Sequence, residues 1–227
     1  MSGFIKTDKA SDQSALLKAI EFILADPAEV QQSALQIKTH YAAQHASERS
    51  ATEVNTEVCN KIITNYANYS AVTGSATALV GVVPGFGTVL ASFGGATAGA
   101  ALSMKYHIEM TMAIAAIYGN DVTQAAAKQA CLVVAGLGAI SEMEQSDSGT
   151  AGPTVFAAAI RQHLETLSPD MLREIFGKVG KMLARNAAKK ALPFGIGVAM
   201  DFSSRKKLMR QAGVKARDFF STTKSVM

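Results

Sequence analysis

The chain has no acidic, basic or histidine residue between Lys61 and Lys105, a gap of 43 residues from Ile62 to Met104. Charged side chains normally mark the solvated face of each element of a soluble domain. Their absence over this length excludes an ordinary run of solvent-exposed helices. The segment must face lipid, lie buried in protein, or change between these two environments.

Tryptophan is absent, only two residues are cysteine, and 18% are charged, against about 25% in an average domain. Cys59 and Cys131 lie in apolar helical contexts, so we expect buried thiols and not a disulfide. The first residues lack the apolar run of about seven residues that a Sec signal peptide requires. These absences give no sign of an oxidising compartment and favour the cytoplasm.

The formal net charge of +4 is unevenly distributed. Residues 172–227 hold 13 Lys and Arg against three acidic residues, whereas residues 1–171 hold 9 basic and 15 acidic residues. A cationic element on an acidic body usually contacts phosphate, on lipid or on nucleic acid.

Apolar residues recur at helical spacing along almost the whole chain, and no strand pattern is evident. Asp26-Pro27 separates the first two helices, because aspartate caps a helix and proline is tolerated at its first position. We therefore predict one all-α domain over residues 1–227, a multi-helix bundle around a Gly/Ala-rich central hairpin. Amphipathic helices occupy residues 1–60, and residues 61–227 form the core. Within this core we expect an apolar hairpin over 64–104 and a basic helix over 198–221. Further helices lie between them, at 105–118, 122–141, 154–167 and 168–190.

The uncharged segment divides at Pro84–Gly87, where proline and two glycines predict a tight turn. Small residues recur every four positions in both arms, which predicts close packing of one arm on the other. These residues are Ser70, Gly74 and Ala78 in the first arm, and Ala91, Gly95, Gly99 and Ser103 in the second.

The two arms barely reach the roughly 20 residues that a spanning helix needs, and they contain few Leu, Ile or Phe. Two interpretations stay open: a close-packed hairpin inside a soluble bundle, and a re-entrant or spanning hairpin that contacts lipid. In the second case the membrane-contact residues are Val82, Val83, Pro84, Phe86, Phe93 and Phe194.

The basic C-terminal helix mixes Lys and Arg with apolar residues, which suits a helix lying on an anionic bilayer, where each basic residue contributes about 1 kcal/mol. The candidate contacts are Arg205, Lys206, Lys207, Arg210, Lys215 and Arg217. A solvated helix face packed through its apolar side is an equally ordinary interpretation. Nucleic-acid binding is disfavoured, because no helix-turn-helix, stacking-aromatic or zinc pattern accompanies the charge.

Three segments resemble the EcsC-like family of bacterial proteins. These are Glu109–Asp121, an apolar helix ending in Tyr-Gly-Asn-Asp, the Gly-rich Val80–Ala100 region, and Leu192–Phe220, in which a Pro-Phe-Gly turn precedes a helix with basic residues and a terminal aromatic pair. The resemblance implies an all-helical fold, membrane association and partner binding, and it implies no reaction. Asp201 stands where that family usually has asparagine.

No catalytic, cofactor-binding or metal-binding motif is present. Lys105 and Glu109 are four residues apart on one helix and are expected to form a structural ion pair. Asp201 lies between apolar residues, so we expect it to be a buried polar group, either paired with Arg205 or linking the two Pro-Gly turns as a pH-responsive acid.

The sequence therefore predicts a non-enzymatic protein associated with the bacterial inner membrane from the cytoplasmic side. Its expected partners are anionic lipid and a protein, either another chain or a second copy of itself. The alternatives are a pore-forming protein that is soluble until triggered, and a soluble adaptor that binds protein or nucleic acid through its basic helix. An enzyme with a pocket near Asp201 is the least favoured alternative.

Overall fold

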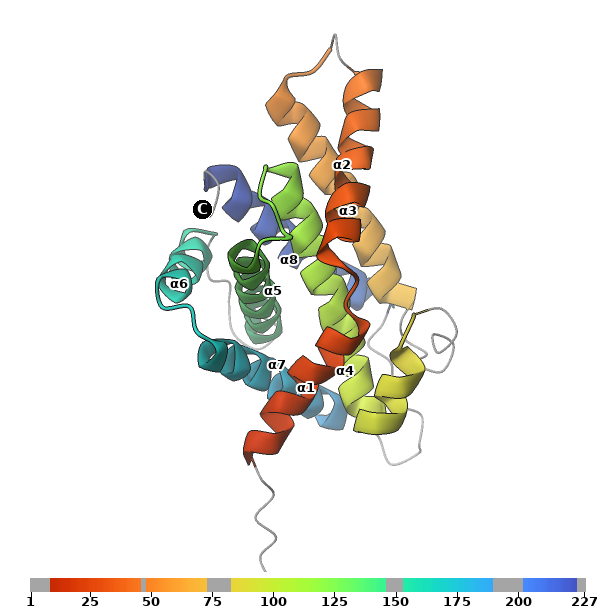
Figure 1. The fold of residues 1–227 in the computed structure, drawn as a ribbon, viewed down its shortest axis with the longest axis vertical. Coiled ribbons are helices and arrows are strands. Elements are labelled where there is room, and N and C mark those ends of the chain that lie inside the picture. The colour runs from red at the N-terminus through yellow and green to blue at the C-terminus, as the bar shows by residue number, and fades with distance from the viewer. Residues whose placement is uncertain (1–8, 46–47, 73–82, 146–152, 190–201, 224–227) are drawn as a thin grey trace, which may run out of the picture.

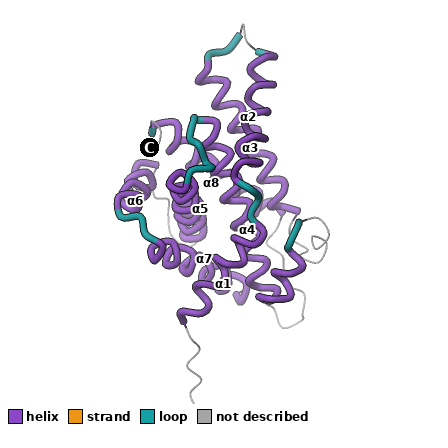
Figure 2. Tube along the Cα trace, in the orientation of Figure 1, coloured by secondary structure: helices purple, strands orange, loops and turns teal. Residues whose placement is uncertain are grey.

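The structure is a computed structural model that describes residues 9–45, 48–72, 83–145, 153–189 and 202–223. Within these ranges every regular element is an α-helix, packed as a multi-helix bundle, which confirms the predicted all-α class (Figure 2). The helices are α1 (Lys9–Ile23), α2 (Pro27–Gln44), α3 (Ala51–Val72), α4 (Phe86–Ile117), α5 (Ala125–Gln145), α6 (Pro153–Glu165), α7 (Pro169–Lys189) and α8 (Phe202–Thr222).

The boundary between α1 and α2 is formed as the sequence predicts. The Asp26 side chain accepts a hydrogen bond from the backbone N–H of Ala28 at 2.8 Å. Pro27 occupies the first turn of α2, where its missing N–H leaves no intrahelical hydrogen bond unmade. The end of α4 is also as expected, because Gly119 follows it with a φ of 89°.

Helix α4 forms the centre of the bundle, and α1, α2, α3, α5, α7 and α8 all contact it (Figure 1). Its second half is almost entirely buried, from Ile108 to Ile117. We expected two helices here, 88–104 and 105–118, but this division is wrong. No proline or glycine separates them, and the interruption within α4 is at Gly94, whose φ of 78° and ψ of 163° lie outside the helical region.

Helices α3 and α8 lie antiparallel, as two contacts between them show. Arg217 donates a hydrogen bond to the Asn60 side chain at 2.7 Å, and Ile63 packs on Gly213. A Cβ atom at Gly213 would come within 2.7 Å of Ile63 and 2.9 Å of the Met110 sulfur, so this close approach of three helices requires glycine.

Helices α3 and α4 are also antiparallel. The Tyr66 and Tyr69 rings lie beside Tyr106, whereas Cys59, two to three turns earlier in α3, lies beside Tyr118 just after α4. Consequently α4 and α8 run parallel. The end of α3 therefore lies beside the middle of α4, and the first half of α8 points toward the same end of α4 as the start of that helix.

The predicted packing of the two hairpin arms through their small residues stays a prediction, because most of the first arm lies outside the described residues. Ala91, Gly95 and Gly99 are exposed, and a Cβ atom at Gly99 would meet no atom within 4 Å. The corresponding residues Gly74 and Ala78 of the first arm lie outside the described residues. In the ranges described, no helix has the length and apolar character needed to cross a membrane.

Candidate surface and buried polar sites

The first half of α8 presents the exposed part of the predicted cationic surface. Lys207 and Arg210 are exposed and Lys206 is half-buried, while Met209 points into the core. This alternation arises because residues three and four apart share one face of a helix. The side chain of Arg205 lies outside the described residues.

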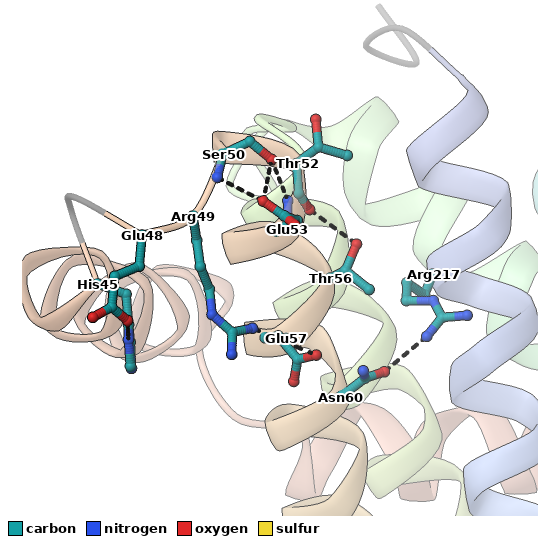
Figure 3. Close-up of polar contacts among 10 residues, drawn as sticks. All are labelled: His45, Glu48, Arg49, Ser50, Thr52, Glu53, Thr56, Glu57, Asn60 and Arg217. Atoms are coloured by element: carbon teal, nitrogen blue, oxygen red, sulfur yellow. Dashed lines mark hydrogen bonds and ion pairs between the residues drawn. The ribbon is translucent and has the colours of Figure 1, made fainter.

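In the second half of α8, the basic side chains form hydrogen bonds and ion pairs with other residues of the protein. Lys215 donates to the Glu142 carboxylate at 2.6 Å and to the Ser141 hydroxyl at 2.9 Å. Arg217 donates hydrogen bonds to the Asn60 side chain and to the neighbouring Asp218 carboxylate. Figure 3 shows the contact with Asn60. Lys215 and Arg217 are therefore removed from the candidate anionic-surface contacts.

The predicted apolar membrane contacts divide in a similar way. The Val83 and Phe86 side chains are buried in the core, which removes both from the exposed surface. Pro84 is exposed and Phe93 is half-buried. Val82, Phe194 and the predicted buried acid Asp201 lie outside the described residues.

The exposed residues near the start of α4 carry no charge, and we call them the uncharged end: Pro84, Thr88, Ala91, Ser92, Gly94, Gly95 and Gly99. Phe22 of α1 adjoins it and is 59% exposed. Its ring lies over Gly85, where a Cβ atom would come within 3.1 Å of the ring, and Gly85 has a φ of 76°. Sequence reasoning missed Phe22, because the helical pattern of α1 did not indicate its proximity to a turn 63 residues later.

Lys105 and Glu109 form the predicted ion pair within α4, and both are buried. The same Glu109 oxygen accepts a hydrogen bond from the backbone N–H of Ala25 at 2.8 Å. This carboxylate therefore connects the centre of α4 to the connection between α1 and α2. Beside it, burial raises the pKa of the Tyr66 hydroxyl, and the Glu109 charge adds to this shift.

Glu142 of α5 and Lys215 of α8 form a second buried ion pair, which the sequence did not indicate. Glu142 is 2% exposed, and only its Oε1 atom has a hydrogen-bond partner, since Oε2 is buried without one. Burial raises the pKa of the Glu142 carboxyl, although Lys215 acts in the opposite direction. The pair joins α5 to α8 across the core.

The polar contacts at the start of α3 are local (Figure 3). Ser50 and Glu53 form a capping box, in which Ser50 donates from its backbone and hydroxyl to the Glu53 carboxylate and accepts from the Glu53 backbone N–H. Arg49 lies 3.8 Å from Glu57. Helix capping explains this cluster, and its side chains do not converge on one point.

The two cysteines are buried away from the surfaces described above, and His107 is half-buried. Burial raises the pKa of the Cys59 and Cys131 thiols to about 12, so both stay protonated and unreactive, as buried free cysteines. Burial lowers the pKa of His107, whose Nδ1 atom contacts the Ser103 carbonyl at 2.9 Å. Among the described residues, no three His, Cys, Asp or Glu side chains are arranged to hold a metal ion.

Comparison with known proteins gave no matching family model, no similar curated protein and no similar solved structure. The resemblance to the EcsC-like family therefore stays a prediction. Any function must be argued from the surfaces and cavities of this chain alone.

Proposed function

We propose that this protein is a non-enzymatic, peripheral membrane protein that binds an anionic bilayer at the cytoplasmic face of a bacterial inner membrane. The single observation that carries the proposal is the arrangement of two surfaces. The first half of α8, with Lys206, Lys207 and Arg210, points toward the same end of α4 as the uncharged end, because α4 and α8 run parallel.

This arrangement suits a bilayer surface for two reasons. Lys and Arg gain electrostatic attraction to anionic headgroups, about 1 kcal/mol per residue. The uncharged end can approach the headgroups without the cost of removing water from charged side chains. The exposed Phe22 and Pro84 add the apolar contact that interfacial proteins place among the headgroups.

Sedimentation with vesicles tests the proposal, with phosphatidylcholine alone compared with a mixture that contains phosphatidylglycerol. We expect binding to the anionic vesicles that weakens at high salt, because exposed charges are screened. The variant Lys207→Glu/Arg210→Glu should lose at least about 2 kcal/mol, roughly thirtyfold in partitioning.

The matched control is Arg161→Glu/Arg173→Glu, which makes the same change in net charge. Arg161 and Arg173 are exposed on α6 and at the start of α7, and α6 packs beside the second half of α8. The control should bind like the unmodified protein. An equal loss of vesicle binding in both variants would show that net charge, and not the position of the α8 residues, determines binding. Absence of binding to anionic vesicles would refute the proposal.

Leakage of an entrapped dye separates this role from the alternative of a pore-forming protein. A peripheral protein binds without releasing dye, because the apolar residues Val83 and Phe86 stay in the core. Dye release at low protein-to-lipid ratio would favour the pore and overturn the peripheral assignment.

A further inference from the structure

A cavity of about 280 Å³ lies between α2, α3 and α4, apart from the α8 surface. One water molecule needs only about 15 Å³ of such space. The cavity therefore has room for a small organic molecule. Its apolar wall comes from Val30, Ala34 and Ile37 of α2, Ile62 of α3 and Ala113 of α4.

The charged groups in the cavity wall are all acidic. They are the carboxylates of Glu29 and Glu109, and the lining contains no Lys, Arg or His. Glu109 is fixed in position, because it is 5% exposed and accepts hydrogen bonds from Ala25 and Lys105. Glu29 lies in the first turn of α2 and is exposed. An anionic ligand is disfavoured by this wall, and a cation is favoured.

Aromatic rings complete the wall. Tyr66 and Tyr69 line the cavity, and Tyr106 packs on both, with ring centroids 6.4 Å from Tyr66 and 6.2 Å from Tyr69. Tyr69 is 53% exposed, so the cavity opens to solvent beside its ring. Carboxylates combined with aromatic rings are the usual recognition elements for ammonium ions.

The fold already places one ammonium group in this environment. The Lys105 Nζ atom pairs with Glu109 and lies 5.8 Å from the centroid of the Tyr106 ring. Lys105 itself is not part of the cavity wall and neutralises one of the two carboxylates. Glu29 then supplies the net negative charge for a second cation.

We propose that this cavity binds a small organic ammonium ion. Glu29 provides the net negative charge, Tyr66 and Tyr69 provide cation–π contacts, and the apolar residues of α2 receive the alkyl groups. The site is independent of the α8 surface and of the function proposed for it.

Isothermal titration with choline chloride tests this site, with dimethylbutanol as the neutral analogue in which carbon replaces nitrogen. We expect saturable binding of choline, and at least about fivefold weaker binding of the analogue. Tyr69→Leu and Glu29→Gln should each weaken choline binding about threefold, because both side chains act at an exposed rim. Circular dichroism checks that both variants are folded.

Glu57→Gln serves as the matched control, since Glu57 is an exposed carboxylate of α3 that does not line the cavity. It should bind choline like the unmodified protein. Absence of choline binding, equal binding of the neutral analogue, or binding unchanged in Tyr69→Leu and Glu29→Gln would overturn the proposal.

The ammonium group could belong to a free amine or to a lipid headgroup, and vesicles distinguish these sources. Binding to phosphatidylcholine vesicles is measured at high salt, because the salt screens the electrostatic contribution of α8. Vesicle binding that Tyr69→Leu weakens about threefold and Lys207→Glu/Arg210→Glu leaves unchanged assigns a lipid headgroup. Binding of free choline without vesicle binding assigns a soluble amine, and failure of both refutes the site while leaving the anionic-vesicle result unaffected.

Discussion

Lys105–Glu109 and Lys215–Glu142 are both buried lysine–glutamate pairs, but their carboxylates are satisfied differently. Glu109 pairs with a lysine one turn away on α4 and also accepts the Ala25 N–H. Glu142 pairs across the core with α8, and its second oxygen has no hydrogen-bond partner. The comparison separates a buried pair that a single helix forms from one that depends on the packing of two helices.

This difference matters because burying a charge costs several kcal/mol unless it is paired and hydrogen-bonded. Glu109 would retain one hydrogen bond if its lysine were removed, whereas Glu142 would retain none that is described. We therefore expect the two pairs to respond unequally to the same substitution.

The largest effect is expected for Lys215→Met. The substitution leaves Glu142 buried without a counter-charge and should lower the free energy of unfolding by about 3–5 kcal/mol at neutral pH. Urea denaturation followed by circular dichroism measures the loss. Adding Glu142→Leu should restore most of the stability, since paired apolar replacements are often neutral. A double variant as unstable as the single one would mean that lost packing, not the charge, causes the effect.

Lys105→Met should have a smaller effect, about 1–3 kcal/mol, because the Ala25 N–H still donates to Glu109. Denaturation under the same conditions gives the comparison directly. A loss equal to that of Lys215→Met would show that the backbone hydrogen bond does not compensate for the missing lysine. The contrast between the two pairs would then be wrong.

The sequence predicted one of these pairs and not the other for a simple physical reason. Positions four apart always meet on a helix, so Lys105 and Glu109 follow from spacing alone. Glu142 and Lys215 are 73 residues apart and meet only because α5 packs on α8. Net charge suggested that Lys215 faces phosphate, since a count of charges cannot tell which face of a helix is buried.

The same contrast between local spacing and tertiary packing explains which other features of the fold and site could be predicted. Helix boundaries at Asp26-Pro27 and Gly119 could be predicted, because capping and left-handed backbone are local properties. The exposure of Gly95 and Gly99, the burial of Phe86, and the cavity beside Glu109 depend on tertiary packing. A periodic pattern of small residues indicates that close packing is allowed, and it does not identify a partner.

The raised pKa of Glu142 predicts a smaller, pH-dependent difference. Its folded pKa lies above the unfolded value near 4.5, because burial disfavours the charged form. The folded state thus binds more protons in that window, and its contribution to stability is present below pH 4.5 and lost as pH rises through the folded pKa.

Comparing the thermal unfolding of the unmodified protein and of Glu142→Gln between pH 4.5 and 7 isolates the contribution of Glu142 titration to stability. The stability of the unmodified protein relative to the variant should fall as pH rises. His107 acts in the opposite direction, because its pKa is lowered, but it is present in both proteins and cancels in the difference. A difference that does not vary with pH would place the Glu142 carboxyl in a more polar environment than its burial indicates.

The smallest effect is expected two residues further along α5, at Glu144. Its carboxylate lies 2.8 Å from Lys178 of α7, and both side chains are 54% exposed. The geometry resembles that of Glu142 and Lys215, but water screens the charges and solvates whichever partner is left. Lys178→Met should therefore change the free energy of unfolding by less than about 0.5 kcal/mol. Because Glu142 and Glu144 share one helix, this variant tests burial with helix identity held constant. A loss as large as that of Lys215→Met would show that joining α5 to a neighbouring helix, rather than excluding water from the charge, determines the cost.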